Sequence, residues 1–239
     1  VRFRQSMIAA HDGSAAGDRT GDGQRRIGWY ADCRRVGRSG RDLRGRYVGM
    51  VFQNPSAALN PVMTVAQQVG LPLYLHYDLS LTERSERVTA MLAKVGLGED
   101  VLAKYPHELS GGQRQRVGIA TALVTSPRLI IADEPTTALD SITQRQIVDL
   151  LTSLVDESGA SMLFITHDFA VLNRATTRCY VLENGWIEES GDTTALLDHP
   201  HTDAGHRLVQ SARALSLHAG QDVGQKPVRN PMHKEVDHD

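Results

Sequence analysis

The feature of this sequence that most constrains its fold is an apolar run, Leu-Ile-Ile-Ala at positions 129–132, that ends in Asp133 and Glu134. Such a continuous apolar run indicates a central strand of a parallel sheet that is covered on both faces. In open α/β sheets, the carboxyl ends of the strands line the ligand crevice. The two adjacent carboxylates are therefore expected where a metal-bound phosphate and an attacking water can be held.

Helical patterns alternate with other apolar strands along the chain. The sequence predicts strands at 47–52 and 162–165, and helices at 65–77, 81–95 and 142–155. Asn184-Gly185, placed between two strand-like stretches, predicts a hairpin with a type I′ turn. The 239 residues are enough for one or two domains, and the alternation predicts an α/β core.

A Ser-Gly-Gly turn begins a further helix, just before the apolar run. Ser110 and Gln113 have the spacing of a capping box. Gly111 and Gly112 would let a phosphate approach the backbone, and the helix dipole would favour its charge. Arg114 and Arg116 add positive charge. Taken alone, the box is explained by helix capping; the string around it, Tyr-Pro-His-Glu-Leu-Ser-Gly-Gly-Gln-Arg-Gln-Arg at 105–116, indicates phosphate binding.

These strings resemble the motifs of ATP-binding cassette (ABC) ATPases, and most closely the subunits that energise dipeptide, oligopeptide and nickel importers. The turn at 109–113 resembles the signature, and the run ending at Glu134 resembles the Walker B motif. Further matches are the Q-loop around Gln53, the D-loop ending at Asp140, and the switch histidine His167. His-Pro-His-Thr at 199–202 resembles a His-Pro-Tyr-Thr element of the same group.

The resemblance implies a role for each matched residue, with ATP and Mg²⁺ as cofactors. Asp133 and Gln53 would bind Mg²⁺, while Glu134 would polarise the attacking water and His167 would contact the γ-phosphate. Gln53 and His167 thus complete the catalytic set with Glu134. The implied nucleotide contacts are Ser110, Gly111, Gly112, Gln113 and Asp140. Without this context, an Asp-Glu pair is explained by a solvated loop and a strand-end histidine by packing.

The resemblance also implies a P-loop NTPase-like (RecA-like) ABC ATPase core that is incomplete at the N-terminus. A partial ATPase domain would span 46–211, with an inserted helical subdomain at about 55–125. Residues 1–45 are expected to be a divergent or disordered segment, and 212–239 a disordered tail. The Arg- and Gly-rich composition of residues 1–45 fits either a divergent arm or out-of-frame translation joined near Leu43.

One expected motif is missing from the sequence. A Gly-x-x-x-x-Gly-Lys-Ser/Thr loop (Walker A) should precede Gln53, but the first lysine is Lys94. One interpretation is an ATPase subunit that is shortened at its N-terminus or frame-shifted; the other is a catalytically inactive half-site or a pseudogene-like fragment. In either case the chain alone is expected to be inactive. It should also expose a strand edge unless residues 1–45 supply a replacement strand.

The implied partners are a second ABC ATPase subunit, identical or different, two membrane-spanning permease subunits and, indirectly, an extracytoplasmic solute-binding protein. The expected location is peripheral, at the cytoplasmic face of the plasma membrane, with the helical subdomain docked on the permease. A net charge of −2 gives no reason to expect nucleic acid as a partner. Cys33 and Cys179 match no metal or redox spacing. The transported solute is not encoded in these motifs.

Overall fold

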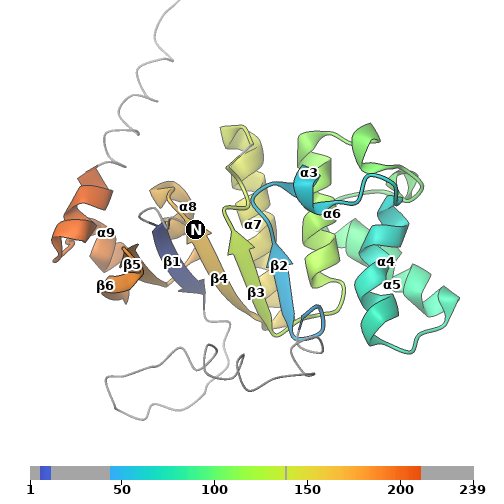
Figure 1. Cartoon of the computed structure of the whole chain (residues 1–239), viewed down its shortest axis with the longest axis horizontal. Coiled ribbons are helices and arrows are strands. Elements are labelled where there is room, and N and C mark those ends of the chain that lie inside the picture. Colours follow the sequence, from blue (N-terminus) through green and yellow to red (C-terminus); the bar gives the residue numbers. More distant parts are fainter. Residues whose placement is uncertain (1–5, 12–43, 138, 211–239) are drawn as a thin grey trace, which may run out of the picture.

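A computed structural model describes residues 6–11, 44–137 and 139–210, and within them a six-stranded sheet in the order β2-β3-β4-β1-β5-β6 (Figure 1). The neighbours β2, β3 and β4 run parallel, whereas β1, β5 and β6 pair antiparallel with their neighbours. The strands are β1 (Ser6–His11), β2 (Val48–Val51), β3 (Leu129–Asp133), β4 (Ser161–Thr166), β5 (Arg178–Glu183) and β6 (Trp186–Asp192). The predicted α/β fold is confirmed.

The helices follow the predicted pattern, with additional short elements that have too few turns to show a period. They are α3 (Pro55–Ala58), α4 (Val65–His76), α5 (Leu81–Lys94), α6 (Gly111–Leu123), α7 (Ser141–Ser158), α8 (Phe169–Ala175) and α9 (Thr193–Asp198), with 3₁₀ turns at Glu99–Val101 and Pro106–Glu108. Capping boxes begin α4, α5 and α6 at Thr64, Ser80 and Ser110. No helix in these described ranges is long and apolar enough to cross a membrane.

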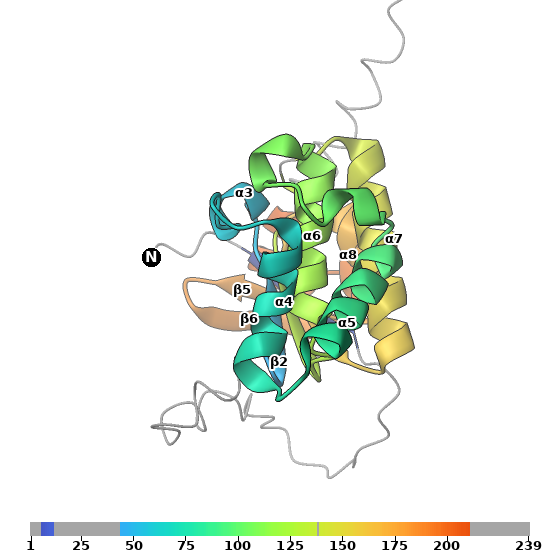
Figure 2. The same cartoon turned by 90° about the vertical axis from the view of Figure 1, so that its right-hand side faces the viewer.

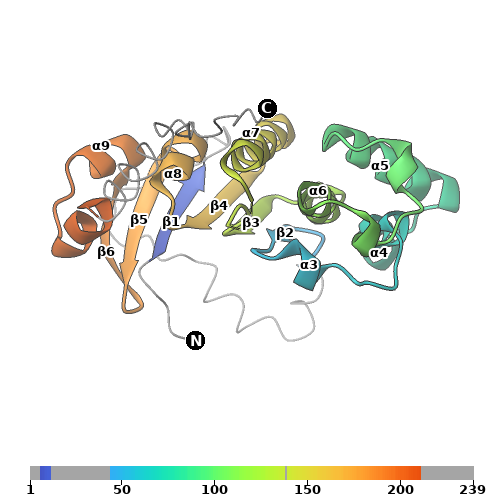
Figure 3. The same cartoon turned by 90° about the horizontal axis from the view of Figure 1, so that it is seen from above.

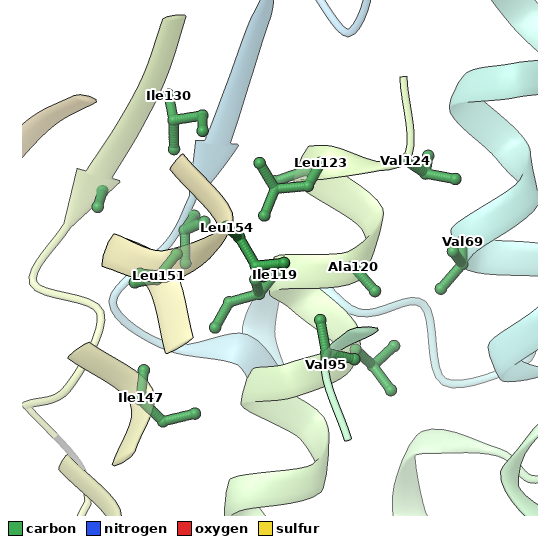
Figure 4. Packing of buried hydrophobic residues seen from close by; sticks show 14 of the residues in the cluster. Val69, Val95, Ile119, Ala120, Leu123, Val124, Ile130, Ile147, Leu151 and Leu154 are labelled. Carbon is green, nitrogen blue, oxygen red and sulfur yellow. The ribbon is translucent and has the colours of Figure 1, made fainter. Parts of the chain in front are cut away.

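Helix α6 joins the sheet to the group of helices α3–α5, which lies to one side of it (Figures 1 and 2). Figure 4 shows Ile119 of α6 directed toward α7, while Ala120 and Val124 are directed toward Val69 of α4. These side chains belong to one buried cluster, and Ile119, Ala120 and Val69 have no exposed area. The signature turn is thus carried on a helix that is packed on both sides.

Strand β1 fills the position between β4 and β5. Ile8 lies opposite Ile165 on one side and Tyr180 on the other. A segment of residues 1–45 therefore supplies the replacement strand on which solubility was expected to depend. The predictions for residues 12–43 and for the tail at 212–239 fall outside the described residues.

The prediction that β3 is covered on both faces is confirmed for one face by the described part of the chain. The row that contains Ala132 and Phe164 is buried, and helices α6, α7 and α8 lie on that face of the sheet (Figure 3). On the other face, Ile131 and Leu163 are only half-buried, and Met50 in the same row is 39% exposed. The apolar run provides for two covering layers, but the described helices supply only one.

The β5–β6 hairpin has the predicted turn. Asn184 and Gly185 both adopt positive φ, at 51° and 88°, as a type I′ turn requires. Glycine has no Cβ and accepts this conformation readily.

Candidate nucleotide site

The turn at Ser110 is closed by two reciprocal hydrogen bonds between Ser110 and Gln113. The Gln113 amide donates to Ser110 Oγ (3.2 Å), and the Ser110 amide donates to Gln113 Oε1 (2.9 Å). Within the described residues, the amides of Gly111 and Gly112 have no hydrogen-bond partner, and a Cβ on Gly111 would meet no atom within 4 Å. The predicted capping box is confirmed, and it leaves these two amides without a partner among the described residues at the positive end of α6.

The two arginines after the turn have structural contacts. Arg114 Nε donates to the carbonyl of Leu109 (3.1 Å), and Arg116 Nη1 donates to the carbonyl of Val95 at the end of α5 (2.6 Å). These bonds fix α6 to the segments that precede it. The positive potential at the turn therefore comes mainly from the N-terminal end of α6, and the two guanidinium groups hold α6 in position.

A second group of side chains converges on Glu134 at the carboxyl end of β3. Its Oε2 accepts hydrogen bonds from Gln53 Nε2 (2.7 Å) and Thr137 Oγ1 (2.9 Å), and its Oε1 lies 3.0 Å from His167 Nδ1. The Glu134 side chain is 22% exposed and that of His167 is 57% exposed. Three of the residues predicted from separate motifs, Gln53, Glu134 and His167, are thus brought together by the sheet.

The backbone places Glu134 at this point through an unusual conformation. Its φ is +43°, which is uncommon for a residue with a side chain, and its amide donates to the carbonyl of Ile165 on β4 (2.9 Å). The bond fixes the end of β3 beside the end of β4, where His167 follows. Backbone conformations of this kind cluster at active sites and ligand-binding segments.

Thr137 is a member of this group that sequence reasoning did not assign to it. Its amide donates to the Glu134 carbonyl (3.3 Å), which closes a turn through Pro135 and returns the hydroxyl to the carboxylate. The spacing of three residues with a proline between them is the signal that could have identified it.

Asp133 is half-buried beside this cluster. Burial raises the pKa of its carboxyl above the usual value, and the negative charge of Glu134 raises it further. A cation bound beside Asp133 would stabilise its ionised form and lower this pKa again. Within the described ranges, no group of three or more His, Cys, Asp or Glu side chains could bind a metal. Asp133 and Gln53 would therefore fit Mg²⁺ only as a few protein oxygens completed by phosphate and water, which is the usual arrangement for this ion.

Asp140 caps α7. Its carboxylate accepts hydrogen bonds from the Ile142 and Thr143 amides (3.1 and 3.0 Å) and from the Thr143 hydroxyl (2.7 Å). The bonds from Thr143 are the main reason that the pKa of Asp140 is lowered. A Cβ on Gly112 would lie 3.3 Å from the Thr143 side chain, so the signature turn lies against the same helix start.

Comparison with known proteins agrees with this arrangement. The family model described as ABC transporter matches residues 28–137. Its match begins inside the segment that sequence analysis set apart as residues 1–45, where no periodic pattern was visible. The chain is 47% identical over 177 residues to a Brucella ovis protein named for ATP binding in peptide import, covering 73% of this chain and 52% of that protein. It is 45% identical over 161 residues to the oligopeptide transport ATP-binding protein OppF of Escherichia coli, covering 66% and 48%.

The chain thus spans about half the length of these curated relatives. Among solved structures, it resembles the dimeric post-hydrolysis state of the ATP-binding cassette MJ0796 bound to ADP and Pi. The TM-score is 0.57 at 37% identity, covering 64% of this chain and 66% of that chain. The motifs, their placement in the sheet and these similarities agree that the chain contains an ABC transporter ATPase domain.

Proposed function

We propose that this chain is an ATP-binding subunit of an ABC importer for peptides, nickel or a related small solute, and that its signature turn completes an ATP site on a second ATPase subunit. The observation that carries the proposal is the turn itself, where the amides of Gly111 and Gly112 have no hydrogen-bond partner among the described residues and the space beside Gly111 is open. The names of the relatives, which concern peptide and oligopeptide import, support the solute class.

In this role the turn would act on the γ-phosphate of a nucleotide bound by the partner subunit. Two amides and the positive end of the helix would stabilise the phosphate charge, while Ser110 remains bonded to Gln113. Asp140 would fix the neighbouring helix start. On the chain's own side, Glu134 would orient water, with His167 and Gln53 at its carboxylate, and Asp133 would bind Mg²⁺. ATP binding would draw the two subunits together.

The partners and location follow from the same proposal. Two permease subunits would receive the motion through the helical subdomain at about 55–125, and a solute-binding protein would deliver the solute outside. The chain would then be peripheral, at the cytoplasmic face of the plasma membrane.

The test is ATP hydrolysis by the complex reconstituted with its permease and a partner ATPase whose own phosphate loop is intact. Ser110→Arg places a cation and a bulky side chain at the phosphate position, and it should abolish hydrolysis that depends on this turn. Ser80→Arg is the matched control, because Ser80 begins α5 with the same capping box but has no phosphate to meet. Hydrolysis that survives Ser110→Arg but is lost with Glu134→Gln would refute the proposed role of the turn.

A second candidate is a subunit whose own site is inactive, since the sequence contains no Gly-x-x-x-x-Gly-Lys-Ser/Thr loop. In that case the purified chain at millimolar Mg-ATP should release phosphate no faster than its Glu134→Gln variant. Glu134→Gln should also have little effect in the mixed complex. Turnover by the purified chain clearly above that of the variant would exclude the inactive half-site.

A further inference from the structure

The residue after His167 links β4 to α8. The amide of Asp168 donates to Thr166 Oγ1 at the end of β4 (3.0 Å), and its carbonyl accepts the amide of Leu172 in α8 (3.2 Å). Thr166 is buried and Asp168 is half-buried. The side chain of His167 itself is 57% exposed, so packing restricts it little. The placement of His167 therefore depends on how firmly its neighbour Asp168 is held.

A side chain from α7 also holds Asp168. Gln144 Nε2 donates to Asp168 Oδ2 at 2.6 Å, across 24 positions of the sequence. Hydrogen bonds in which one partner is ionised are roughly twice as strong as those between neutral groups. Both side chains are half-buried and line a cleft of about 180 Å³ between α7 and α8. This bond joins α7 to the segment that carries His167.

Helix α7 gives Gln144 a fixed position. Gln144 lies in the first turn of the helix, and its amide donates to the carbonyl of the cap residue Asp140 (2.8 Å). Ile147 and Val148, which follow it, are buried in the core. α7 and α8 lie on the same side of the sheet and contact each other (Figure 3). Gln144 is thus a donor on a packed helix, whereas the segment that it holds is a loop between β4 and α8.

The contact between His167 and Glu134 requires one particular form of the imidazole. An ionised carboxylate only accepts hydrogen bonds, so His167 Nδ1 must carry a proton to donate to Glu134 Oε1 at 3.0 Å. In a neutral imidazole, the nitrogen that carries the proton is set by the hydrogen bonds that the ring makes. The ring of His167 must therefore be held beside Glu134 for its Nδ1–H form to be favoured.

We propose that Gln144 is a positioning residue, and that its hydrogen bond to Asp168 holds the His167 ring against the carboxylate of Glu134. Gln144 acts through Asp168 and the backbone of the loop, and not on a nucleotide. The contact itself concerns the chain alone. Its consequence for ATP hydrolysis rests on the proposed function, in which Glu134 orients water with His167 at its carboxylate.

The ring nitrogens of His167 report this contact directly. NMR of the full chain labelled with ¹⁵N-histidine, in mildly alkaline buffer where an imidazole is ordinarily neutral, shows which ring nitrogen carries the proton. The His167→Gln variant identifies the His167 signals among those of the 10 histidines. Gln144→Glu replaces the donor by a second carboxylate beside Asp168, and the population of the Nδ1–H form of His167 should fall at least about twofold. If Gln144→Glu does not fold, Gln144→Met removes the donor without adding a charge and should show the same loss.

Gln146→Glu is the matched control, because Gln146 is exposed on the same helix. It should leave the Nδ1–H form unchanged. Gln144→Glu combined with Asp168→Asn exchanges donor and acceptor and should restore the wild-type form, while Asp168→Asn alone keeps an acceptor for Gln144 and should also resemble the wild type. An unchanged Nδ1–H form in Gln144→Glu, an equal loss in Gln146→Glu, or no recovery in the double variant would overturn the proposal.

Hydrolysis separates this inference from the proposed function. In the reconstituted complex, Gln144→Glu should lower kcat by up to about a hundredfold and leave KM for Mg-ATP within about twofold, because it displaces His167 without removing a group that binds ATP. Loss of the Nδ1–H form with an unchanged kcat would support the positioning role and refute hydrolysis at this chain's own site. An unchanged Nδ1–H form overturns the positioning role at any rate of hydrolysis.

Discussion

The signature turn and the Glu134 cluster are built in different ways. The turn is formed within four consecutive residues, Ser110 to Gln113, by hydrogen bonds that span three positions. The cluster joins residues that are 81 positions apart for Gln53 and Glu134, and 33 apart for Glu134 and His167. A local motif keeps its geometry wherever its helix is stable, whereas the cluster exists only while β2, β3 and β4 keep their register.

The largest effect expected from this comparison is on activity at the turn. Gly111→Val should leave the fold unchanged, because a Cβ at this position meets no atom within 4 Å, but it should block phosphate approach. Hydrolysis by the mixed complex should fall at least about a hundredfold, roughly 2.7 kcal/mol, while the melting temperature of the chain moves by no more than about 2 °C.

Unfolding of the Gly111→Val variant, or retention of its hydrolysis, would contradict this prediction. Gly118→Val is the matched control, since Gly118 lies further along the same helix and a Cβ there also meets no atom within 4 Å. This control should retain hydrolysis, because it is remote from the turn.

A smaller effect is expected at the cluster. Thr137→Val removes the hydroxyl that donates to Glu134 at 2.9 Å, and should cost about 1 kcal/mol of unfolding free energy, or roughly 2–4 °C in melting temperature. Thr137→Ser retains the donor and should recover most of this loss. Chemical denaturation of the wild type and the two variants measures the loss of unfolding free energy in Thr137→Val and its recovery in Thr137→Ser.

Equal stabilities for the valine and serine variants would show that the hydroxyl does not stabilise the cluster. The same series could then be repeated with His167→Ala, which removes the contact to the other carboxylate oxygen.

The difference between the two regions also explains what could be predicted from the sequence. The box at Ser110 and the hairpin at Asn184-Gly185 follow from spacing over a few residues, and the structure has both. The meeting of Gln53, Glu134 and His167 was expected only from family resemblance, because no local pattern states which strands are neighbours. The hydroxyl of Thr137 was missed because the spacing to Glu134, with Pro135 between them, was not used as a turn signal.

The position of β1 and the half-exposed face of β3 were beyond sequence reasoning for another reason. Residues Ser6–His11 show no strand period in their surroundings, and their place between β4 and β5 is a matter of long-range pairing. The apolar runs correctly predicted strands, but they could not state which face of each strand the helices would cover.

The smallest expected effect concerns two aspartates with opposite pKa shifts, one beside each region. Burial, with the charge of Glu134, raises the pKa of Asp133 above 3.8, so the folded state binds its proton more tightly than the unfolded state does. Ionised Asp133 therefore lowers stability above its folded pKa, and this cost disappears below 3.8. Asp133→Asn should raise the urea midpoint at pH 7, and the gain should shrink as the pH falls toward 4.

Asp140 should show the opposite sign, since hydrogen bonds from Thr143 lower its pKa below 3.8. Its charge stabilises the folded state above the unfolded value, and that contribution is lost as the pH falls through the folded pKa. Asp140→Asn should therefore lower the urea midpoint at pH 7 and have less effect in acid. Midpoints measured for both variants from pH 7 down to about pH 2 should converge on wild type from opposite sides, Asp133→Asn by pH 3.8 and Asp140→Asn only below it. If both variants lower the urea midpoint at pH 7, the ionised carboxylate of Asp133 does not destabilise the folded state. The reason to expect a bound cation beside Asp133 would then be removed.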